Sequence, residues 1–298
     1  MMQININTKI TGDTKDTPVR KAVQALERDL KNTCKESTEA GLEIRLVNAE
    51  DNINSGTGSL PQNEASYESQ KSIAYDAVSE MFTIDRNEIS LTITSASSLG
   101  LIYGIYHVSR EFLDVQNFWF WNEQELRKEP EHIVPDNYHY ESKPSKVRFR
   151  GWFINDEVLF DGWREKVGEN FPWEMAFEAL LRCGGNMTIP GTDHNSHRYK
   201  NLANDYGLWI THHHAEPLGA QMFARAYPDL EASFNKHPDL FRGLWQQAIE
   251  DQKNCKVVWN LGFRGQGDRP FWTDDPVADA ERYDAYQDTS VFNGLIIL

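Results

Sequence analysis

The 298-residue sequence predicts an α/β fold in which a small N-terminal α/β domain precedes the first half of a (β/α)8 barrel of the TIM type. Apolar, strand-like runs alternate with helical patterns in the second half of the chain, and several of these runs stop abruptly in acids, amides or imidazoles. The segments that show this most clearly are residues 148–157, 207–217 and 257–269. Because the chemistry of such barrels lies at the carboxyl ends of their strands, we expect the functional residues there.

The N-terminal domain is expected over residues 1–145. Apolar residues at three- and four-residue spacing predict its helices, and alternation of apolar and polar residues predicts its strands. In chain order these are a helix over 18–31, strands over 42–47, 82–85 and 89–94, and a helix over 98–113. The turn Arg86-Asn87 joins the second and third strands as a hairpin. The polar, proline-punctuated segment 129–144 is expected to be the linker to the second domain.

The second domain, residues 146–298, is expected to be the truncated first half of the barrel. Its predicted elements are strands over 147–153, 186–189, 208–211 and 256–261, a helix over 172–182, a short helix ending at 206, and a helical region ending near 253. These make about four β/α units, whereas a complete barrel takes roughly 250 residues. The apolar C-terminal segment suggests a fifth strand that is only begun. A half-barrel leaves open sheet edges, so we also expect self-association into a homo-oligomer.

Composition excludes several classes of function. The net charge of −15 argues against nucleic acid or an anionic membrane as the main partner, because both require clustered Lys and Arg. Three widely spaced cysteines without a CxxC pair indicate neither a disulfide framework nor a thiolate zinc site. The start shows no signal peptide and no run of about eighteen apolar residues occurs. The sequence therefore predicts a cytoplasmic protein, or an extracellular one if its natural start were trimmed.

A set of short motifs in a fixed order carries a resemblance to a known family. They are Leu-Ile-Tyr-Gly-Ile-Tyr-His-Val-Ser at 101–109, Phe-Trp-Phe-Trp at 118–121, Arg-Gly-Trp-Phe-Ile-Asn-Asp-Glu at 150–157, Gly-Gly-Asn at 184–186, His-His-Ala-Glu-Pro at 213–217 and Phe-Arg-Gly-Gln-Gly-Asp at 263–268. In this order and spacing the sequence resembles the N-terminal part of glycoside hydrolase family 115, the xylan α-1,2-glucuronidases. The resemblance implies release of (4-O-methyl)glucuronic acid from glucuronoxylan or its oligosaccharides, with inversion and without a metal or other cofactor.

An inverting glycosidase needs two carboxyl groups roughly 6.5–9.5 Å apart, one protonated acid and one base that activates water. Four carboxylates follow predicted strands: Glu157, Asp193, Glu216 and Asp268. Glu157 and Asp268 match the family pattern best and are expected to be catalytic, with the assignment of acid and base left open. The alternative for Glu157 is a loop carboxylate that caps the following turn.

The remaining candidates are expected to contact the carbohydrate substrate. Arg264 suits bidentate recognition of a uronic acid carboxylate, although an internal ion pair with Asp268 would serve only to shape the loop. Trp272 lies in a loop, where its ring could stack on a sugar. The other predicted substrate contacts are Asn155, Asn186, Asp193, His213, His214 and Glu216. Asn186 has the alternative of a helix C-terminal residue without a substrate role.

Two alternatives of other classes stay open. On a continuous strand, His212, His214 and Glu216 would lie on one side and could hold zinc, which would make the protein a metal hydrolase. Pro217 would interrupt such a strand, and the resembled family uses no metal, so no metal site is predicted. The other alternative is a catalytically incomplete fragment that only binds acidic sugars or self-associates.

Overall fold

The computed structural model describes residues 2–49, 79–155 and 157–261, and the chain divides into two compact units. Unit 1 comprises Met1–Arg150, Met175–Asn186 and Asp205–Gly207; unit 2 comprises Gly151–Glu174, Met187–Asn204 and Leu208–Leu298. The domain boundary expected at residue 145 stays a prediction. None of the helices in the described part of the chain is long and apolar enough to cross a membrane.

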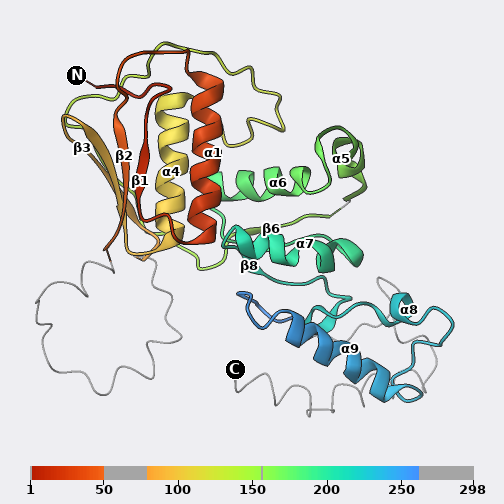
Figure 1. Cartoon of the computed structure of the whole chain (residues 1–298). Coiled ribbons are helices and arrows are strands. Elements are labelled where there is room, and N and C mark those ends of the chain that lie inside the picture. The colour runs from red at the N-terminus through yellow and green to blue at the C-terminus, as the bar shows by residue number, and fades with distance from the viewer. Residues whose placement is uncertain (1, 50–78, 156, 262–298) are drawn as a thin grey trace, which may run out of the picture. The chain divides into compact units, whose positions relative to one another are not determined.

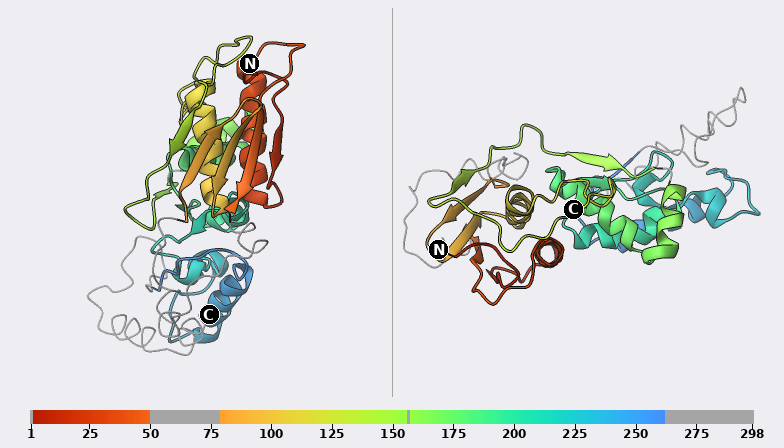
Figure 2. Two further views of the ribbon diagram at one scale, coloured as in Figure 1. Left: turned by 90° about the vertical axis from the view of Figure 1, so that its left-hand side faces the viewer. Right: turned by 90° about the horizontal axis from the view of Figure 1, so that it is seen from above.

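Unit 1 is built on a five-stranded sheet covered on one face by two long helices (Figures 1 and 2). The strand order is β1 (Ile10–Gly12), β2 (Glu43–Asn48), β4 (Ser90–Ser95), β3 (Phe82–Arg86) and β5 (His139–Glu141). β1, β2 and β4 are parallel, while β3 runs antiparallel to both of its neighbours. The covering helices are α1 (Thr17–Thr33) and α4 (Ser98–Leu113).

Local sequence explains how α4 lies on this sheet. The Ser97 hydroxyl accepts a hydrogen bond from the Gly100 backbone N–H, which caps the helix at its start. Gly104 faces the sheet, and a Cβ there would come within 2.3 Å of Ile93 Cγ2. A larger residue would therefore push the helix away from β4. The predicted helices and the β3–β4 hairpin are confirmed, whereas β1 was not predicted.

The expectation that residues 129–144 form a linker is wrong for part of that segment. His139–Glu141 forms β5 and pairs with β3 as an edge strand of the unit 1 sheet. His132 also exchanges backbone hydrogen bonds with Ile4. β5 pairs over only three residues and lies in a proline-containing segment. Its alternation of apolar and polar residues is therefore too short to detect in the sequence, which is why the segment resembled a linker.

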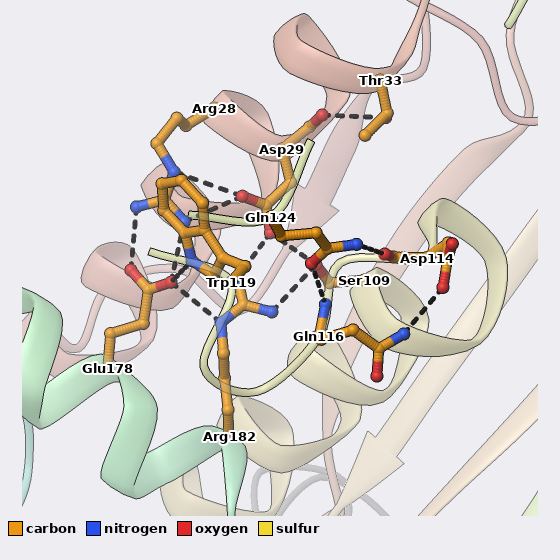
Figure 3. Close-up of polar contacts among 10 residues, drawn as sticks. All are labelled: Arg28, Asp29, Thr33, Ser109, Asp114, Gln116, Trp119, Gln124, Glu178 and Arg182. Atoms are coloured by element: carbon orange, nitrogen blue, oxygen red, sulfur yellow. Dashed lines mark hydrogen bonds and ion pairs between the residues drawn. The ribbon is translucent and has the colours of Figure 1, made fainter. Parts of the chain in front are cut away.

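A buried ionic network, which we call the Asp29 network, ties residues 175–182 of α6 (Phe171–Arg182) to α1 and α4 (Figure 3). Arg182 Nη2 donates to Asp29 Oδ2 at 2.5 Å, and Arg182 Nε donates to Glu178 Oε1 at 2.8 Å. Arg28 donates to both carboxylates, and the Ser109 hydroxyl and the Trp119 indole N–H complete their hydrogen bonds. The Asp29 and Arg182 side chains are 0% and 1% exposed, so the charges are buried as a paired set.

Unit 2 contains a small parallel sheet with helices after its strands. Its order is β6 (Gly151–Phe153), β7 (Met187–Ile189) and β8 (Trp209–Ile210). The other elements are η1 (Glu157–Phe160), α5 (Asp161–Val167), α7 (His194–Asp205), η2 (Pro217–Gly219), α8 (Phe223–Ala226) and α9 (Pro238–Asp251). The β/α alternation was predicted, but the sheet is open within the described residues and no closed barrel is seen there.

The strand expected over residues 256–261 is reduced to one parallel bridge between Ile210 and Val257. Around it, Ile210 N–H donates to Lys256 O at 2.7 Å, and Val258 N–H donates to Ile210 O at 2.8 Å. The segment therefore lies beside β8, as the predicted strand order requires, but β8 has only two residues with which to pair. Length rather than position is the error in that prediction.

Candidate active site

The candidate active site is formed where the three strands of unit 2 end. β6 leads to Glu157, β7 leads to Thr192 and Asp193, and β8 leads to the segment from His212 to Glu216. Because β6, β7 and β8 are parallel neighbours, their carboxyl ends meet at one edge of the sheet. Three of the four carboxylates expected at strand ends, Glu157, Asp193 and Glu216, therefore come together there.

Glu157 joins the end of β6 to the end of β7. Its side chain is buried at the first position of η1, and its Oε1 accepts hydrogen bonds from the Thr192 backbone N–H and, at 3.0 Å, from the Thr192 hydroxyl. The backbone passes close to this carboxylate at Gly191, where φ is +92° and a Cβ would lie 2.7 Å from Glu157 Oε1. Only glycine fits such a position without strain. Glu157 thus contacts the neighbouring strand end.

Glu216 is the most deeply buried acid of the site, with 1% of the residue exposed. Its Oε1 accepts a hydrogen bond from the Asp193 backbone N–H at 2.5 Å, whereas its Oε2 has no hydrogen-bond partner within the described residues. Burial, together with the nearby charges of Asp193 and Glu157, raises the pKa of Glu216 to about 7, against the opposing effect of hydrogen bonds from Asp193 and Ser196. This carboxyl group therefore holds a proton up to neutral pH.

Asp193 lies beside Glu216 in a strained backbone position. Its φ of 49° places it in the left-handed region, which costs free energy for a residue other than glycine. One carboxylate oxygen, Oδ2, pairs with Arg225 Nε at 3.1 Å, and the other, Oδ1, is buried without a hydrogen-bond partner among the described residues. Asp193 and Glu216, which are joined by the hydrogen bond from the Asp193 N–H, thus each keep one buried oxygen without a partner among the described residues.

The three histidines after β8 differ in environment. His212 is buried, both of its ring nitrogens are without hydrogen-bond partners in the described part of the chain, and burial lowers its pKa to about 3. It is therefore a neutral imidazole. His213 is half-buried, with its ring centroid 5.5 Å from that of Phe153 and 3.9 Å from that of His214, which is exposed. His213 and His214 thus lie at the strand end predicted for them, and their substrate contacts remain predictions.

The zinc alternative assumed a continuous strand from His212 to Glu216, and that assumption is wrong. β8 ends at Ile210, and the chain then turns so that the Glu216 backbone N–H donates to His213 O at 2.9 Å. Alternating residues therefore no longer face the same side. Within the described residues no group of three or more His, Cys, Asp or Glu side chains is arranged to hold a metal ion.

Asn155 is exposed after β6 and lies at the predicted edge of the sheet. The substrate contact of Asn186 stays a prediction, although the contacts of its side chain favour the alternative without a substrate role. Asn186 precedes β7, at the amino end of that strand, and its amide is occupied: Oδ1 accepts from the Arg150 N–H at 2.9 Å, and Nδ2 donates to Arg148 O and Glu80 Oε1. Its role is to join the chain segments around residues 80, 150 and 186. Asp268, Arg264 and Trp272 lie outside the described residues.

Two contributors to the site were missed from the sequence. Thr192 supplies both donors to Glu157, and Arg225 pairs with Asp193 from helix α8, 32 residues away in the chain. Thr192 directly precedes Asp193, which was predicted as a site residue, so its place after the strand 186–189 was the available signal. Nothing in a single sequence indicates which of the many arginines reaches Asp193.

No curated protein matches the sequence. Among solved structures, a family GH115 4-O-methyl-α-glucuronidase with specificity for decorated arabinogalactans is similar with a TM-score of 0.63 and 20% identity, covering 95% of this chain and 40% of that one. The chitobiase of Flavobacterium johnsoniae is similar with a TM-score of 0.48 and 13% identity, covering 100% of this chain and 46% of that one.

The first of these similarities shows a shared fold, and this chain spans 40% of the length of that glucuronidase. The family assignment has a separate basis in the sequence. Residues 142–291, which include every strand end of the candidate site, match glycosyl hydrolase family 115. The matched region covers half of the chain, and the chain therefore belongs to glycosyl hydrolase family 115.

Proposed function

We propose that this protein is an inverting glycosidase that releases (4-O-methyl)glucuronic acid from glucuronoxylan or its oligosaccharides. Membership of the family supports the class of reaction. The similar structure is a 4-O-methyl-α-glucuronidase with specificity for decorated arabinogalactans, which supports the sugar released and adds arabinogalactan as a second candidate for the carrier polysaccharide. On this proposal the bond cleaved joins glucuronic acid to xylan or to arabinogalactan.

The observation that carries this proposal is the gathering of Glu157, Asp193 and Glu216 at the ends of adjacent parallel strands. Inverting hydrolysis needs one protonated and one ionised carboxyl group on opposite sides of the bond. Like charges in a buried setting raise the pKa of one member, and here that member is Glu216, at about 7. Glu216 thereby joins Glu157 and Asp268 as a candidate for the acid.

The unsatisfied oxygens support a ligand at this edge of the sheet. Buried polar atoms in folded proteins almost always have hydrogen-bond partners, because an unmet acceptor costs roughly 1–3 kcal/mol. Glu216 Oε2 and Asp193 Oδ1 are both buried and without partners among the described residues. Hydroxyl groups of a bound sugar would supply a donor to Asp193 Oδ1 and would accept a hydrogen bond from Glu216 Oε2 when Glu216 is protonated.

Arg264 is proposed as the group that recognises the uronic acid carboxylate, on sequence grounds. A guanidinium binds a carboxylate through two parallel hydrogen bonds, which a neutral sugar cannot accept. Replacement Arg264→Ala should therefore reduce kcat/KM for a glucuronide far more than for the matching neutral glucoside. An equal loss on both substrates would remove Arg264 from that role.

The direct test is release of glucuronic acid by the 298-residue chain from aldouronic xylo-oligosaccharides and from glucuronosylated arabinogalactan oligosaccharides. Glu157→Gln and Glu216→Gln should each lower release by about 10²–10⁴-fold, the usual contribution of a positioned acid or base. The matched control is Glu231→Gln, an exposed acid paired with Lys236, which should leave release unchanged.

Two results would contradict the proposal. Release that survives both active-site substitutions would show that these carboxylates take no part in the chemistry. No release from either substrate by the folded chain would exclude hydrolysis by this polypeptide. Calorimetric binding of glucuronic acid that Glu157→Gln or Glu216→Gln weakens, without release, would then favour the alternative of a protein that only binds acidic sugars.

A further inference from the structure

Unit 1 contains a cavity that shares no residue with the candidate active site. It lies against α4, the β3–β5 edge of the sheet, residues 142–145 and residues 181–184 at the end of α6. Its volume of about 240 Å³ is well above the ~30 Å³ that one water molecule occupies in the liquid. The cavity is therefore large enough to admit a small solute.

Aromatic side chains form much of its wall. The ring centroids of His107 and Tyr140 are 4.0 Å apart, and Phe82 lies 5.6 Å from Tyr140 and 5.8 Å from His107. Tyr103 also lines the cavity. Tyr140 and Tyr103 are half-buried and so present part of their surface to the space. Ring faces of this kind attract the C–H faces of sugars through many small dispersion contacts.

The charged residues of the wall fall into two groups. Arg182 and Glu80 are already neutralised, by Asp29 and Glu178 in the first case and by Arg150 in the second. Arg110 and Lys143 are exposed and form no ion pair within the described residues. The cavity thus keeps two uncompensated positive charges in a chain whose net charge is −15, which favours an anionic occupant.

An unsatisfied hydroxyl provides an independent sign of a ligand. Tyr106 lines the cavity and is only 4% exposed, yet its phenolic hydroxyl has no hydrogen-bond partner in the described part of the chain. Its ring is held in place by the Arg182 guanidinium, which lies 4.6 Å from the ring centroid. A buried hydroxyl normally finds a partner in the protein or in a bound molecule.

We propose that this cavity binds one carboxylate-bearing sugar, a uronic acid residue, as a non-catalytic site. The pyranose ring packs on Tyr140 and Tyr103, the carboxylate is attracted by Arg110 and Lys143, and a sugar hydroxyl pairs with the Tyr106 hydroxyl. The choice of a uronic acid among anionic sugars rests on the proposed function, whereas the anionic and aromatic character of the site does not. The site would hold the protein on a polymer that carries acidic side groups.

The test uses calorimetric titration of the full chain with glucuronic acid and with glucose. Glucuronic acid should bind, and the double variant Arg110→Ala/Lys143→Ala should weaken its binding at least tenfold. The matched control is Lys35→Ala/Lys146→Ala, which removes the same charge from exposed lysines outside the cavity. Tyr106→Phe, which removes only the hydroxyl, should weaken binding while the near-UV circular dichroism stays unchanged.

Several outcomes would overturn the inference. These are the absence of glucuronic acid binding at millimolar concentration, equal binding of glucose and glucuronic acid, and equal weakening by the cavity and control double variants. The proposed function fails in a different way, through loss of glucuronic acid release. If no glucuronic acid is released but the cavity variants weaken its binding, the cavity site is established and only the proposed function fails. If glucuronic acid is released but the cavity variants leave its binding unchanged, the cavity site is refuted and the proposed function stands.

Discussion

Two buried clusters of charge in this molecule have opposite character. In the Asp29 network every carboxylate oxygen of Asp29 and Glu178 accepts at least one hydrogen bond, and acids alternate with arginines (Figure 3). At the candidate active site three acids converge, and Glu216 and Asp193 each keep one oxygen without a partner among the described residues. Similar residue types at similar depth are therefore satisfied in one place and unsatisfied in the other.

The pKa directions express this difference. Burial alone would raise the pKa of Glu178, but hydrogen bonds from Arg28 and the charges of Arg182 and Arg28 outweigh it and lower the pKa to about 2. At Glu216 burial is not outweighed, because the charges of the neighbouring acids add to it, and the pKa rises to about 7. The lowered pKa shows that the folded protein favours the charged form of Glu178, and the raised pKa shows that it favours the neutral form of Glu216.

The largest expected effect follows from removing the central cation of the Asp29 network. Arg182→Ala leaves Asp29 and Glu178 buried with Arg28 as their remaining cationic partner, which should cost about 3–5 kcal/mol of the free energy of unfolding. Urea titration followed by tryptophan fluorescence measures it. A loss below about 1 kcal/mol would show that the network is no more stabilising than a surface pair.

Glu216→Gln should increase the free energy of unfolding at alkaline pH, whereas Arg182→Ala decreases it. The folded-state pKa of about 7 exceeds the ordinary 4.5, so the wild-type protein loses stability as pH rises from 4.5 to 7. The variant avoids ionising a buried carboxyl group and should be more stable at pH 8 by on the order of 2–3 kcal/mol. Urea titrations at pH 4 and pH 8 check this, and no difference should appear at pH 4. A less stable variant at pH 8 would contradict the raised pKa.

The contribution of Glu178 to stability should fall as pH falls, whereas that of Glu216 falls as pH rises. Its folded-state pKa of about 2 lies below the ordinary 4.5, so its contribution is present above pH 4.5 and is lost as pH falls toward 2. Lowering the pH from 6 to 3 should cost the wild-type protein on the order of 2 kcal/mol more than it costs Glu178→Gln. The same loss in both proteins would assign the acid sensitivity to other carboxylates.

The smallest effect is expected at an exposed ion pair. Lys236 and Glu231 are 2.5 Å apart, with side chains 57% and 65% exposed. Solvent screens such pairs, so Lys236→Ala should change the free energy of unfolding by less than about 1 kcal/mol in the same urea titration. A larger change in the free energy of unfolding would show that exposed ion pairs in this protein stabilise it as much as buried ones, against the assumption of the other predictions.

The sequence predicted those features that depend on neighbouring residues. The helix over 98–113 has the predicted bounds, because its apolar spacing and the Ser97 cap are local signals. The β/α alternation and three of the acids at strand ends were predicted for the same reason. β5 was missed because it pairs over only three residues.

Features that depend on distant parts of the chain could not be predicted. Arg182 and Asp29 are 153 positions apart, and no local pattern links them. The partners of the Asn186 amide could not be predicted either, because Glu80 and Arg148 are 106 and 38 positions away in the chain. The raised pKa of Glu216 depends on burial and on charges from two other strand ends, which a sequence lists but does not bring together.

The separation of Asp29 from its partner also sets an order of events during protein synthesis. Residues 1–150 leave the ribosome before residues 175–186, which complete the same unit. At the usual 5–20 residues per second, Asp29 and Arg28 wait roughly 8–30 seconds for Glu178 and Arg182. During that interval Asp29 has only Arg28 as a cationic partner, so unit 1 should reach its final packing only after Glu178 and Arg182 have emerged.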